Sequence, residues 1–155
     1  MKWIFDLNLI IKISQKVKMQ PIEEKLRPDF EFNGEKSCII EPDSDTNKGG
    51  IWIGDFHAAH DIEGLKDAGI SHVVSALKPD GCMKLKQLYP AVGITHLHIH
   101  SDDHSEFNMY QHFETVYDFI TDARKNGNVM VHCFGGVGRS PTLTLAYLMK
   151  DKKIG

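Results

Sequence analysis

The pattern of hydrophobic and polar positions changes near Ser37. Residues 1–36 show no clear hydrophobic period and carry scattered charges, which predicts an N-terminal extension or a partly disordered arm. From Ser37 onward, short apolar runs alternate with stretches in which apolar residues recur at helical spacing. We therefore expect one folded domain over residues 37–155, preceded by this extension.

Five short apolar runs, of which the third is rich in β-branched residues, predict strands. A turn-rich segment, Glu41–Gly50, separates the first two runs. The predicted strands are Ser37–Ile40, Ile51–Ile53, Ile70–Ala76, Leu97–His100 and Val129–His132.

Two helices are expected between these strands. The first covers Ala58–Ala68, with Gly69 as its stop signal. The second begins at Asn108, which can cap a helix, and ends at Asn126-Gly127. One face of this second helix is apolar and consists of Phe113, Val116, Tyr117, Ile120 and Ala123.

A third helix is expected to begin at about Arg139. Pro141 fits its first turn, where the missing N–H group of proline costs nothing. Short strands that alternate with helices predict an α/β fold with a mainly parallel central sheet flanked by helices.

The composition is that of one soluble globular domain, because 41% of the 155 residues are hydrophobic and 25% are charged. The formal net charge of −3 gives no global attraction to nucleic acid or to an anionic membrane, so an anionic substrate must be bound by a local site. The three cysteines, Cys38, Cys82 and Cys133, are few and irregularly spaced. They predict a reducing compartment, the cytoplasm or the nucleus, rather than a disulfide framework.

The first residues, Met1–Ile13, are apolar enough to suggest a signal peptide. However, Asp6, Asn8 and Lys12 interrupt the run, and no small-residue cleavage site follows it. The run is also too short to span a membrane. We expect it to be neither a signal peptide nor an anchor, and translation could equally begin at Met19.

The segment most informative about function is Val131–Ser140, with the sequence V-H-C-F-G-G-V-G-R-S. It leads from a predicted strand through a loop with three glycines into a predicted helix. Glycine permits the backbone dihedrals that turn successive N–H groups inward, and the helix N-terminus adds unpaired N–H groups and partial positive charge. The segment therefore predicts a cradle for a dianion such as phosphate.

Cys133 lies at the start of this cradle, where the amides, the helix N-terminus and Arg139 all favour the thiolate, which is the nucleophilic form. Arg139 offers a planar fork that can bind two phosphate oxygens at once. Ser140 can donate its hydroxyl hydrogen to the thiolate when sulfur is the leaving group. The loop lacks the Gly-Lys-Ser/Thr end of a nucleotide-binding P-loop, so a nucleophilic cysteine is the favoured interpretation.

The stretch H-C-F-G-G-V-G-R-S resembles the signature loop of the cysteine-based protein phosphatases. The continuation S-P-T-L-T-L-A-Y-L-M, together with G-G-I-W-I-G-D and L-K-D-A-G-I-S-H-V-V, is similar to the dual-specificity branch. The likeness covers about Ser37–Gly155. It implies a protein-tyrosine-phosphatase-like fold and hydrolysis of phosphotyrosine, and of phosphoserine or phosphothreonine, in phosphoproteins. It also implies a phosphocysteine intermediate without metal or cofactor.

The resemblance also implies roles for individual residues. The family places a general acid five residues before the asparagine that opens the next helix, which corresponds to Asp103 rather than its neighbour Asp102. His132 would be a buried support for the loop. The phosphate would be bound by Phe134, Gly135, Gly136, Val137, Gly138 and Arg139, with Ser140 in support.

Two departures from the family pattern bear on substrate and fold. Gly135 and Gly138 replace the alanine and serine that dual-specificity phosphatases often have, and Val-Gly-Arg also occurs in tyrosine-specific and glucan-directed relatives. The loop has no lysines, which argues against an inositide substrate. Only 15 residues follow Ser140, so we expect a domain without the two further C-terminal helices of the family.

Several alternatives remain open at the level of sequence. His96, His98 and His100 share one face of a predicted strand and could bind a metal ion. Cys38 and Cys82 are expected to be structural, although either could resolve an oxidised Cys133. The rival functions are a phosphoglucan phosphatase and a non-catalytic module that binds phosphoproteins.

Overall fold

The computed structural model describes residues 36–101, 109–134 and 139–151, and within them five strands form one sheet in the order β1-β2-β5-β3-β4. β1 is antiparallel to β2, and every other pairing is parallel. The strands are β1 Lys36–Ile40, β2 Ile51–Gly54, β3 Ile70–Leu77, β4 Thr95–His100 and β5 Asn128–His132. All five predicted strands and the mainly parallel sheet are therefore confirmed, with ends that differ by one or two residues.

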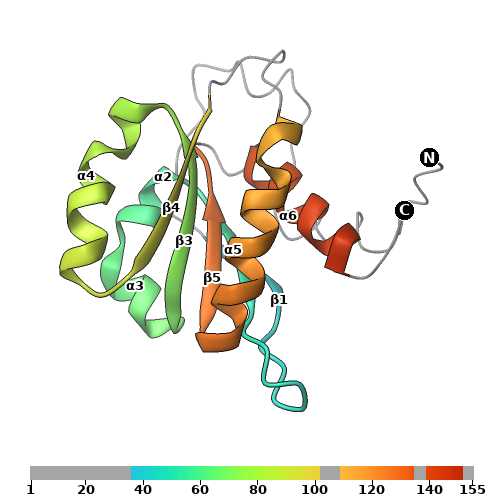
Figure 1. Ribbon diagram of the computed structural model, residues 1–155. Helices are drawn as coiled ribbons and strands as arrows, with labels where there is room; N and C mark the ends of the chain where they lie inside the picture. Colours follow the sequence, from blue (N-terminus) through green and yellow to red (C-terminus); the bar gives the residue numbers. More distant parts are fainter. Residues whose placement is uncertain (1–35, 102–108, 135–138, 152–155) are drawn as a thin grey trace.

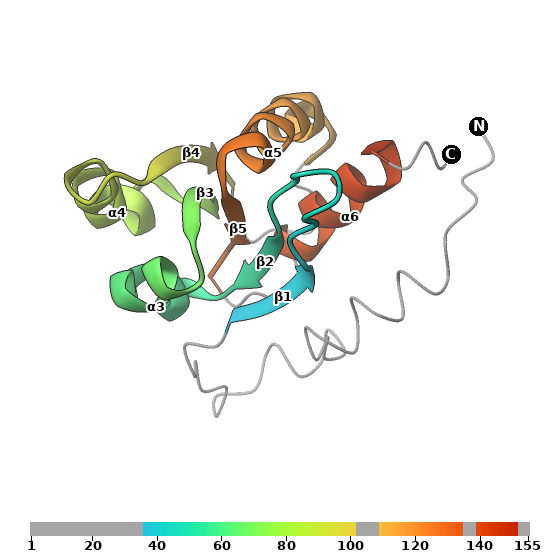
Figure 2. The same cartoon turned by 90° about the horizontal axis from the view of Figure 1, so that it is seen from below.

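Helices cover both faces of this sheet (Figures 1 and 2). α2, α3 and α4 lie on one face, and α5 and α6 lie on the other. The bounds are α2 Phe56–His60, α3 Ile62–Asp67, α4 Pro79–Ala91, α5 Phe113–Asn126 and α6 Arg139–Asp151, with a 3-10 turn, η2, at Met109–His112. Both helices predicted in the C-terminal half are present.

The sheet separates two hydrophobic cores, because its buried strands present apolar side chains on both faces. On the α5 and α6 side, the core includes Val74, Val131, Ile120, Leu143 and Leu148. On the opposite side it includes Val73, Met130, Leu65, Leu85 and Tyr89. The alternation of neighbours such as Val73 and Val74 between the two cores is the two-residue period of a strand.

The prediction of a single helix over Ala58–Ala68 is wrong, because the chain turns at Asp61. Asp61 has φ −82° and ψ 81°, which is outside the helical region. It ends α2 and caps α3, since its carboxylate accepts a hydrogen bond from the N–H of Gly64 at 3.0 Å. The predicted stop is in place, because Gly69 follows α3 with a φ of +67° that favours glycine.

α4 was not predicted, since Pro79, Asp80 and Gly81 resemble a turn. Pro79 instead occupies the first turn of the helix, where proline is tolerated. The helix buries Cys82, Leu85 and Tyr89 at helical spacing. The hydroxyl of Tyr89 donates to the carbonyl oxygen of Ala59 at 2.6 Å and so joins α4 to α2.

α5 begins at Phe113, after the 3-10 turn, and its N-terminal cap is His112. The predicted cap, Asn108, lies outside the described residues. The predicted apolar face does contact the core: Val116, Ile120 and Ala123 are buried, while Phe113 and Tyr117 are partly buried against the same cluster.

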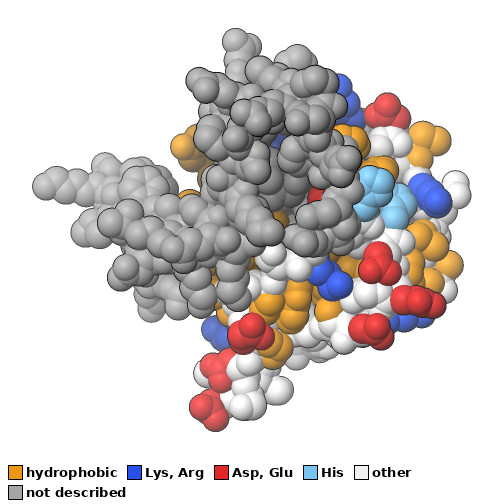
Figure 3. All heavy atoms as spheres, turned by 180° about the vertical axis from the view of Figure 1, so that it is seen from behind, with side chains coloured by type: hydrophobic (Ala, Val, Ile, Leu, Met, Phe, Trp, Pro, Cys, Tyr) orange, Lys and Arg blue, Asp and Glu red, His pale blue; other side chains and the backbone are white. Residues whose placement is uncertain are grey.

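The segment between β1 and β2 projects from the body of the domain (Figure 1). Asp43 and Lys48 bridge its two sides, and Figure 3 shows acidic side chains on the projection. Its base is fixed by Arg124 of α5, which is buried and donates from Nε to the carbonyl oxygen of Gly49 at 2.7 Å. Arg124 also donates to the hydroxyl of Tyr147 at 3.0 Å, so one side chain links the projection, α5 and α6.

The extension predicted over residues 1–36 falls almost entirely outside the described residues, although Lys36 already belongs to β1. No helix in the described part of the chain is long and apolar enough to cross a bilayer.

Candidate active site

The carboxyl ends of β3, β4 and β5 meet at one edge of the sheet, which is where ligands bind in parallel α/β folds. β5 ends at His132, and Cys133 follows directly. α6 begins at Arg139 and points its N-terminus back toward the same edge. Residues from three strands and one helix therefore converge around Cys133.

The structure brings Cys133 and Ser140 together. The sulfur of Cys133 lies 3.4 Å from the hydroxyl oxygen of Ser140, which belongs to the first turn of α6. Cys133 is 3% exposed and Ser140 is fully buried. A hydroxyl at this distance can donate to a thiolate, as the sequence leads us to expect.

Arg139 is held by a residue that the sequence did not single out. Its Nη1 donates to the carbonyl oxygen of Ser101 at 2.9 Å and to the Ser101 hydroxyl at 3.1 Å. Ser101 is fully buried and follows β4, where its N–H donates to the carbonyl oxygen of Leu77 at 3.1 Å. Asp102 and Asp103 come next in the chain but lie outside the described residues.

The loop between Cys133 and Arg139 is described only at Phe134; Gly135, Gly136, Val137 and Gly138 lie outside the described residues. The Phe134 side chain is 46% exposed. Its carbonyl oxygen accepts a hydrogen bond from the N–H of Phe56 at 2.9 Å, and the two rings are 5.3 Å apart. The first residue of α2 therefore anchors the start of the loop.

His132 is fully buried beside Cys133. Its Nδ1 lies 3.1 Å from the carbonyl oxygen of Cys133, and its Nε2 lies 2.5 Å from the hydroxyl oxygen of Ser75 on β3. Burial lowers the pKa of His132 to about 3, so the imidazole is neutral at physiological pH. His132 is thus a neutral, fully buried side chain beside Cys133.

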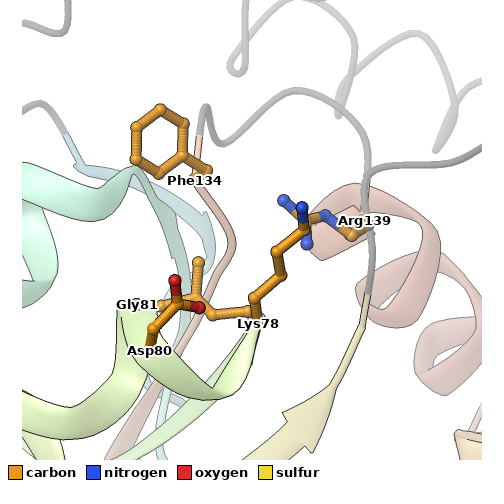
Figure 4. A pocket seen from close by; sticks show the side chains of 6 residues that line it. Lys78, Asp80, Gly81, Phe134 and Arg139 are labelled. Atoms are coloured by element: carbon orange, nitrogen blue, oxygen red, sulfur yellow. The ribbon is translucent and has the colours of Figure 1, made fainter.

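A pocket of about 290 Å³ opens beside Arg139. Figure 4 shows Phe134 on one side of it and the Arg139 guanidinium on the other, with Lys78 extending from the end of β3 toward Arg139. The lining residues are Leu77, Lys78, Asp80, Gly81, Phe134 and Arg139. Lys78 and Asp80 are not among the site residues expected from the sequence, although their position after a predicted strand is a signal that could have identified them.

Among the described residues, the three alternating histidines of β4 are not grouped as metal ligands. The Nε2 of His96 lies 2.7 Å from the Ser75 hydroxyl, and the Nε2 of His98 lies 2.9 Å from the carbonyl oxygen of Leu77. Within residues 36–101, 109–134 and 139–151, no three His, Cys, Asp or Glu side chains are grouped to hold a metal ion.

None of the three cysteines is in a disulfide. Cys82 belongs to α4 and is fully buried, and this burial raises the pKa of its thiol. Cys38 is partly buried on β1, with its sulfur 3.3 Å from the carbonyl oxygen of Ile40. These surroundings agree with structural roles for both side chains.

Comparison with known proteins identifies a matching family. Residues 51–155 match the family model "Dual specificity phosphatase, catalytic domain". Dual specificity protein phosphatase 26 of Rattus norvegicus is 38% identical over 102 residues, which are 64% of this chain and 48% of the relative. MAP kinase phosphatase with leucine-rich repeats protein 1 of Dictyostelium discoideum is 34% identical over 115 residues, 74% of this chain and 13% of the relative. The chain thus spans about half the length, or less, of these curated relatives.

Solved structures share the fold. The crystal structure of DUSP15 is 31% identical, with a TM-score of 0.57, and the match covers 68% of this chain and 64% of that one. Human DUSP28 has a TM-score of 0.58 at 24% identity, with 68% of each chain covered.

Proposed function

Because the chain belongs to the dual-specificity phosphatase family, we propose that it hydrolyses phosphotyrosine, and phosphoserine or phosphothreonine, in phosphoproteins through a phosphocysteine intermediate. One observation carries the proposal. Cys133 lies at the carboxyl end of β5, with its sulfur 3.4 Å from the Ser140 hydroxyl, and the same first turn of α6 begins with Arg139. A nucleophile, a hydrogen-bond donor to it and a phosphate-binding cation are thus joined by one strand–loop–helix unit.

In the first step, the Cys133 thiolate attacks phosphorus. The sulfur–phosphorus bond forms as the bond from phosphorus to the substrate oxygen breaks. Asp103 gives its proton to that departing oxygen, so the alcohol or phenol leaves neutral. Asp103 is assigned on the family pattern, and the described residues support it only indirectly, since Ser101 precedes it and contacts Arg139.

In the second step, water attacks the phosphocysteine. Asp103, now a carboxylate, takes a proton from the water as its oxygen bonds to phosphorus, and the sulfur leaves as a thiolate. The Ser140 hydroxyl can donate a hydrogen bond to the sulfur at this moment, which stabilises the departing charge. Inorganic phosphate is released and the starting thiolate is regenerated.

Arg139 is proposed to bind two oxygens of the phosphoryl group. The contacts to Ser101 hold its guanidinium at the wall of the pocket, which supports this role. Such a fork can follow the phosphoryl group through the reaction, because the equatorial oxygens keep their charge when the bond to the leaving group breaks.

The lining of the pocket favours an aromatic phosphate ester in a protein as the substrate. The half-exposed ring of Phe134 offers a flat apolar wall to a phosphotyrosine ring, and Lys78 offers a cation for acidic residues nearby. The relatives named above are protein phosphatases, which disfavours the glucan alternative. A non-catalytic binding module is disfavoured because the cysteine, the arginine and the candidate acid are all present.

The phosphate site lies within one protein domain of slightly negative charge, so nucleic acid and membrane surfaces are not proposed as partners. A thiolate nucleophile works only while it is reduced, and a reducing compartment, the cytoplasm or the nucleus, suits this requirement.

The proposal is tested by measuring turnover of a small aryl phosphate and of a phosphotyrosine peptide, with the unchanged protein and with Cys133→Ser. The substitution should reduce kcat at least about a hundredfold, because a covalent nucleophile is lost. Binding of the phosphopeptide should persist, since the loop amides and Arg139 remain. A folded Cys133→Ser protein with more than about one hundredth of the original activity would rule out this nucleophile.

A further inference from the structure

A line of hydrogen bonds crosses three neighbouring strands beneath the nucleophile. It begins at His96 on β4, passes through Ser75 on β3 and reaches His132 at the end of β5. It ends at the carbonyl oxygen of Cys133 itself. Ser75 and His132 are fully buried, so the hydrogen bond between them is shielded from solvent.

The chemistry of the partners gives every bond in this line a single direction. A carbonyl oxygen only accepts, so the Nδ1 of His132 must carry the proton and donate to Cys133. Because a neutral imidazole has one such proton, the Nε2 of His132 is an acceptor, and the Ser75 hydroxyl must donate to it. The hydroxyl hydrogen is then used, so His96 must donate from Nε2 to the Ser75 oxygen.

The surroundings keep both histidines neutral. Burial lowers the pKa of His96 to about 4, with His98 and Lys86 adding to the effect. The ring of Tyr89 packs edge-on against His96, and the Cys82 sulfur lies 3.8 Å from its Nε2. Around His132, the nearby His60, His96 and Arg139 act in the same direction as burial.

From this geometry we propose that Ser75 and His96 are positioning residues for the nucleophile, a role that rests on the proposed phosphatase function. Together they fix His132 in the tautomer that donates to the Cys133 carbonyl group. This bond orients the peptide unit of Cys133, and with it the start of the loop that binds phosphate. Neither Ser75 nor His96 lines the pocket beside Arg139, so they act through His132.

The first test replaces Ser75 with alanine. Ser75→Ala removes the donor to the Nε2 of His132, and the imidazole can then adopt the opposite tautomer and lose its bond to Cys133. We expect kcat to fall about tenfold, the equivalent of one lost hydrogen bond, with KM changed less than about twofold. Long-range proton–nitrogen NMR spectra should show His132 protonated at Nδ1 in the original protein and a rise of the Nε2-protonated form in the variant.

The second test uses matched substitutions on β4. His96→Gln keeps an N–H donor for Ser75, whereas His96→Leu removes it and leaves the hydroxyl able to turn its hydrogen away from His132. His96→Leu should lower kcat severalfold and shift the His132 tautomer, and His96→Gln should restore most of both. His98→Leu is the control, since His98 bonds to Leu77 and not to Ser75, and it should leave both readouts unchanged.

The proposal is overturned if Ser75→Ala leaves the His132 tautomer and kcat unchanged, or if His96→Gln is as damaging as His96→Leu. The tautomer readout does not require turnover. Failure of the proposed phosphatase function is therefore distinguishable from failure of the positioning role. If only the phosphatase function fails, the unchanged protein is inactive but His132 is still protonated at Nδ1.

Discussion

The contact between Arg139 and Ser101 joins the phosphate-binding side chain to the end of β4. Two oxygens of Ser101 accept from a single nitrogen of the guanidinium. We assign binding of the phosphoryl oxygens to the same guanidinium. To bind both Ser101 and the phosphoryl oxygens, Arg139 needs the planar shape of the guanidinium and not only its charge.

We therefore expect Arg139→Lys to lower kcat/KM at least about a hundredfold, although the charge is kept, because an ammonium group cannot bind two phosphate oxygens as a fork. Steady-state kinetics on a phosphotyrosine peptide measures this loss. Ser101→Ala is the matched control: it removes the hydroxyl acceptor but keeps the carbonyl acceptor, so a severalfold loss is expected. Near-normal activity of Arg139→Lys would contradict the proposed fork.

The choice between Asp102 and Asp103 is tested by the leaving group. Asp103→Asn should slow hydrolysis of phosphotyrosine by about 10²–10⁴, because its phenolate leaves poorly without a proton. Aryl phosphates with weakly basic leaving groups should be affected much less, and the basic limb of the pH–rate profile should flatten. Asp102→Asn should do neither. A plot of kcat against leaving-group pKa for both variants decides the matter, and a selective loss at Asp102 would reverse the assignment.

Site residues that are contiguous in the chain could be predicted from the sequence, whereas those brought together by strand pairing could not. Cys133, Arg139 and Ser140 form one motif, and Ser140 does lie against the Cys133 sulfur. Ser75 is 57 positions from His132 and reaches it only because the two residues are paired between β3 and β5. No spacing along the chain encodes that register.

The helix that contacts the start of the phosphate-binding loop is short, so its stability depends on the capping of its ends. α2 has only five residues, and its N-cap Asp55 is buried. The Asp55 carboxylate accepts from the N–H of Ala58 at 2.7 Å, which fixes the first turn. That turn also presents the N–H of Phe56 to the carbonyl oxygen of Phe134, so the cap supports the loop through one intermediate contact.

Replacing this cap should destabilise the domain. Asp55→Ala is expected to lower the free energy of unfolding by about 1–2 kcal/mol, the upper part of the range for caps, because the site is buried. Asp55→Asn keeps an acceptor oxygen and should lose much less. Asp61→Ala, at the exposed cap of α3, should cost about 0.5–1 kcal/mol. Urea unfolding measures the free energy of unfolding of the three variants. Equal losses of stability in Asp55→Ala and Asp61→Ala would contradict the role of burial.

Helix prediction failed where packing overrides local signals. Ala58–Ala68 contains no proline, and Asp61, a residue type that also occurs inside helices, caps α3 here. The turn at Asp61 lets both α2 and α3 place apolar residues on the same core. α4 opens with residues typical of a turn, and its stability comes from Cys82, Leu85 and Tyr89 against the sheet. By contrast, the apolar stripe of α5 and the glycine after it suffice for prediction, because that helix is long and strongly amphipathic.

For the molecule as a whole, the buried His132 and the partly buried His96 set a dependence of stability on pH. The pKa of His132 is lowered to about 3 and that of His96 to about 4, whereas an unfolded histidine has a pKa of about 6.5. Below pH 6.5 the unfolded chain therefore binds protons that the folded chain does not, and stability falls as pH falls. Above that pH neither histidine contributes a pH dependence.

We expect the free energy of unfolding to be constant near pH 7.5 and to decrease from about pH 6.5 toward pH 4. His132 alone contributes a slope of up to about 1.4 kcal/mol per pH unit, and the partly exposed His96 contributes less because water screens its charge. Urea unfolding at pH 7.5, 6 and 5 measures the slope, which His96→Gln should reduce. Equal stability at pH 7.5 and 5 would contradict the neutral, buried state of these side chains.

β5 occupies the centre of the sheet but is the last of the described strands in the chain. β2 and β3, which flank it, pair with it and not with each other, through residues up to 78 positions apart such as Ile51 and Val129. During synthesis, the edges of β2 and β3 that will face β5 stay unpaired until β5 has been made. Strand pairings between residues so far apart in the chain form slowly. Cys133 and α6 follow β5 directly, so closing the sheet and assembling the site are one kinetic event. On refolding, catalytic activity should return in the same phase as the tertiary structure.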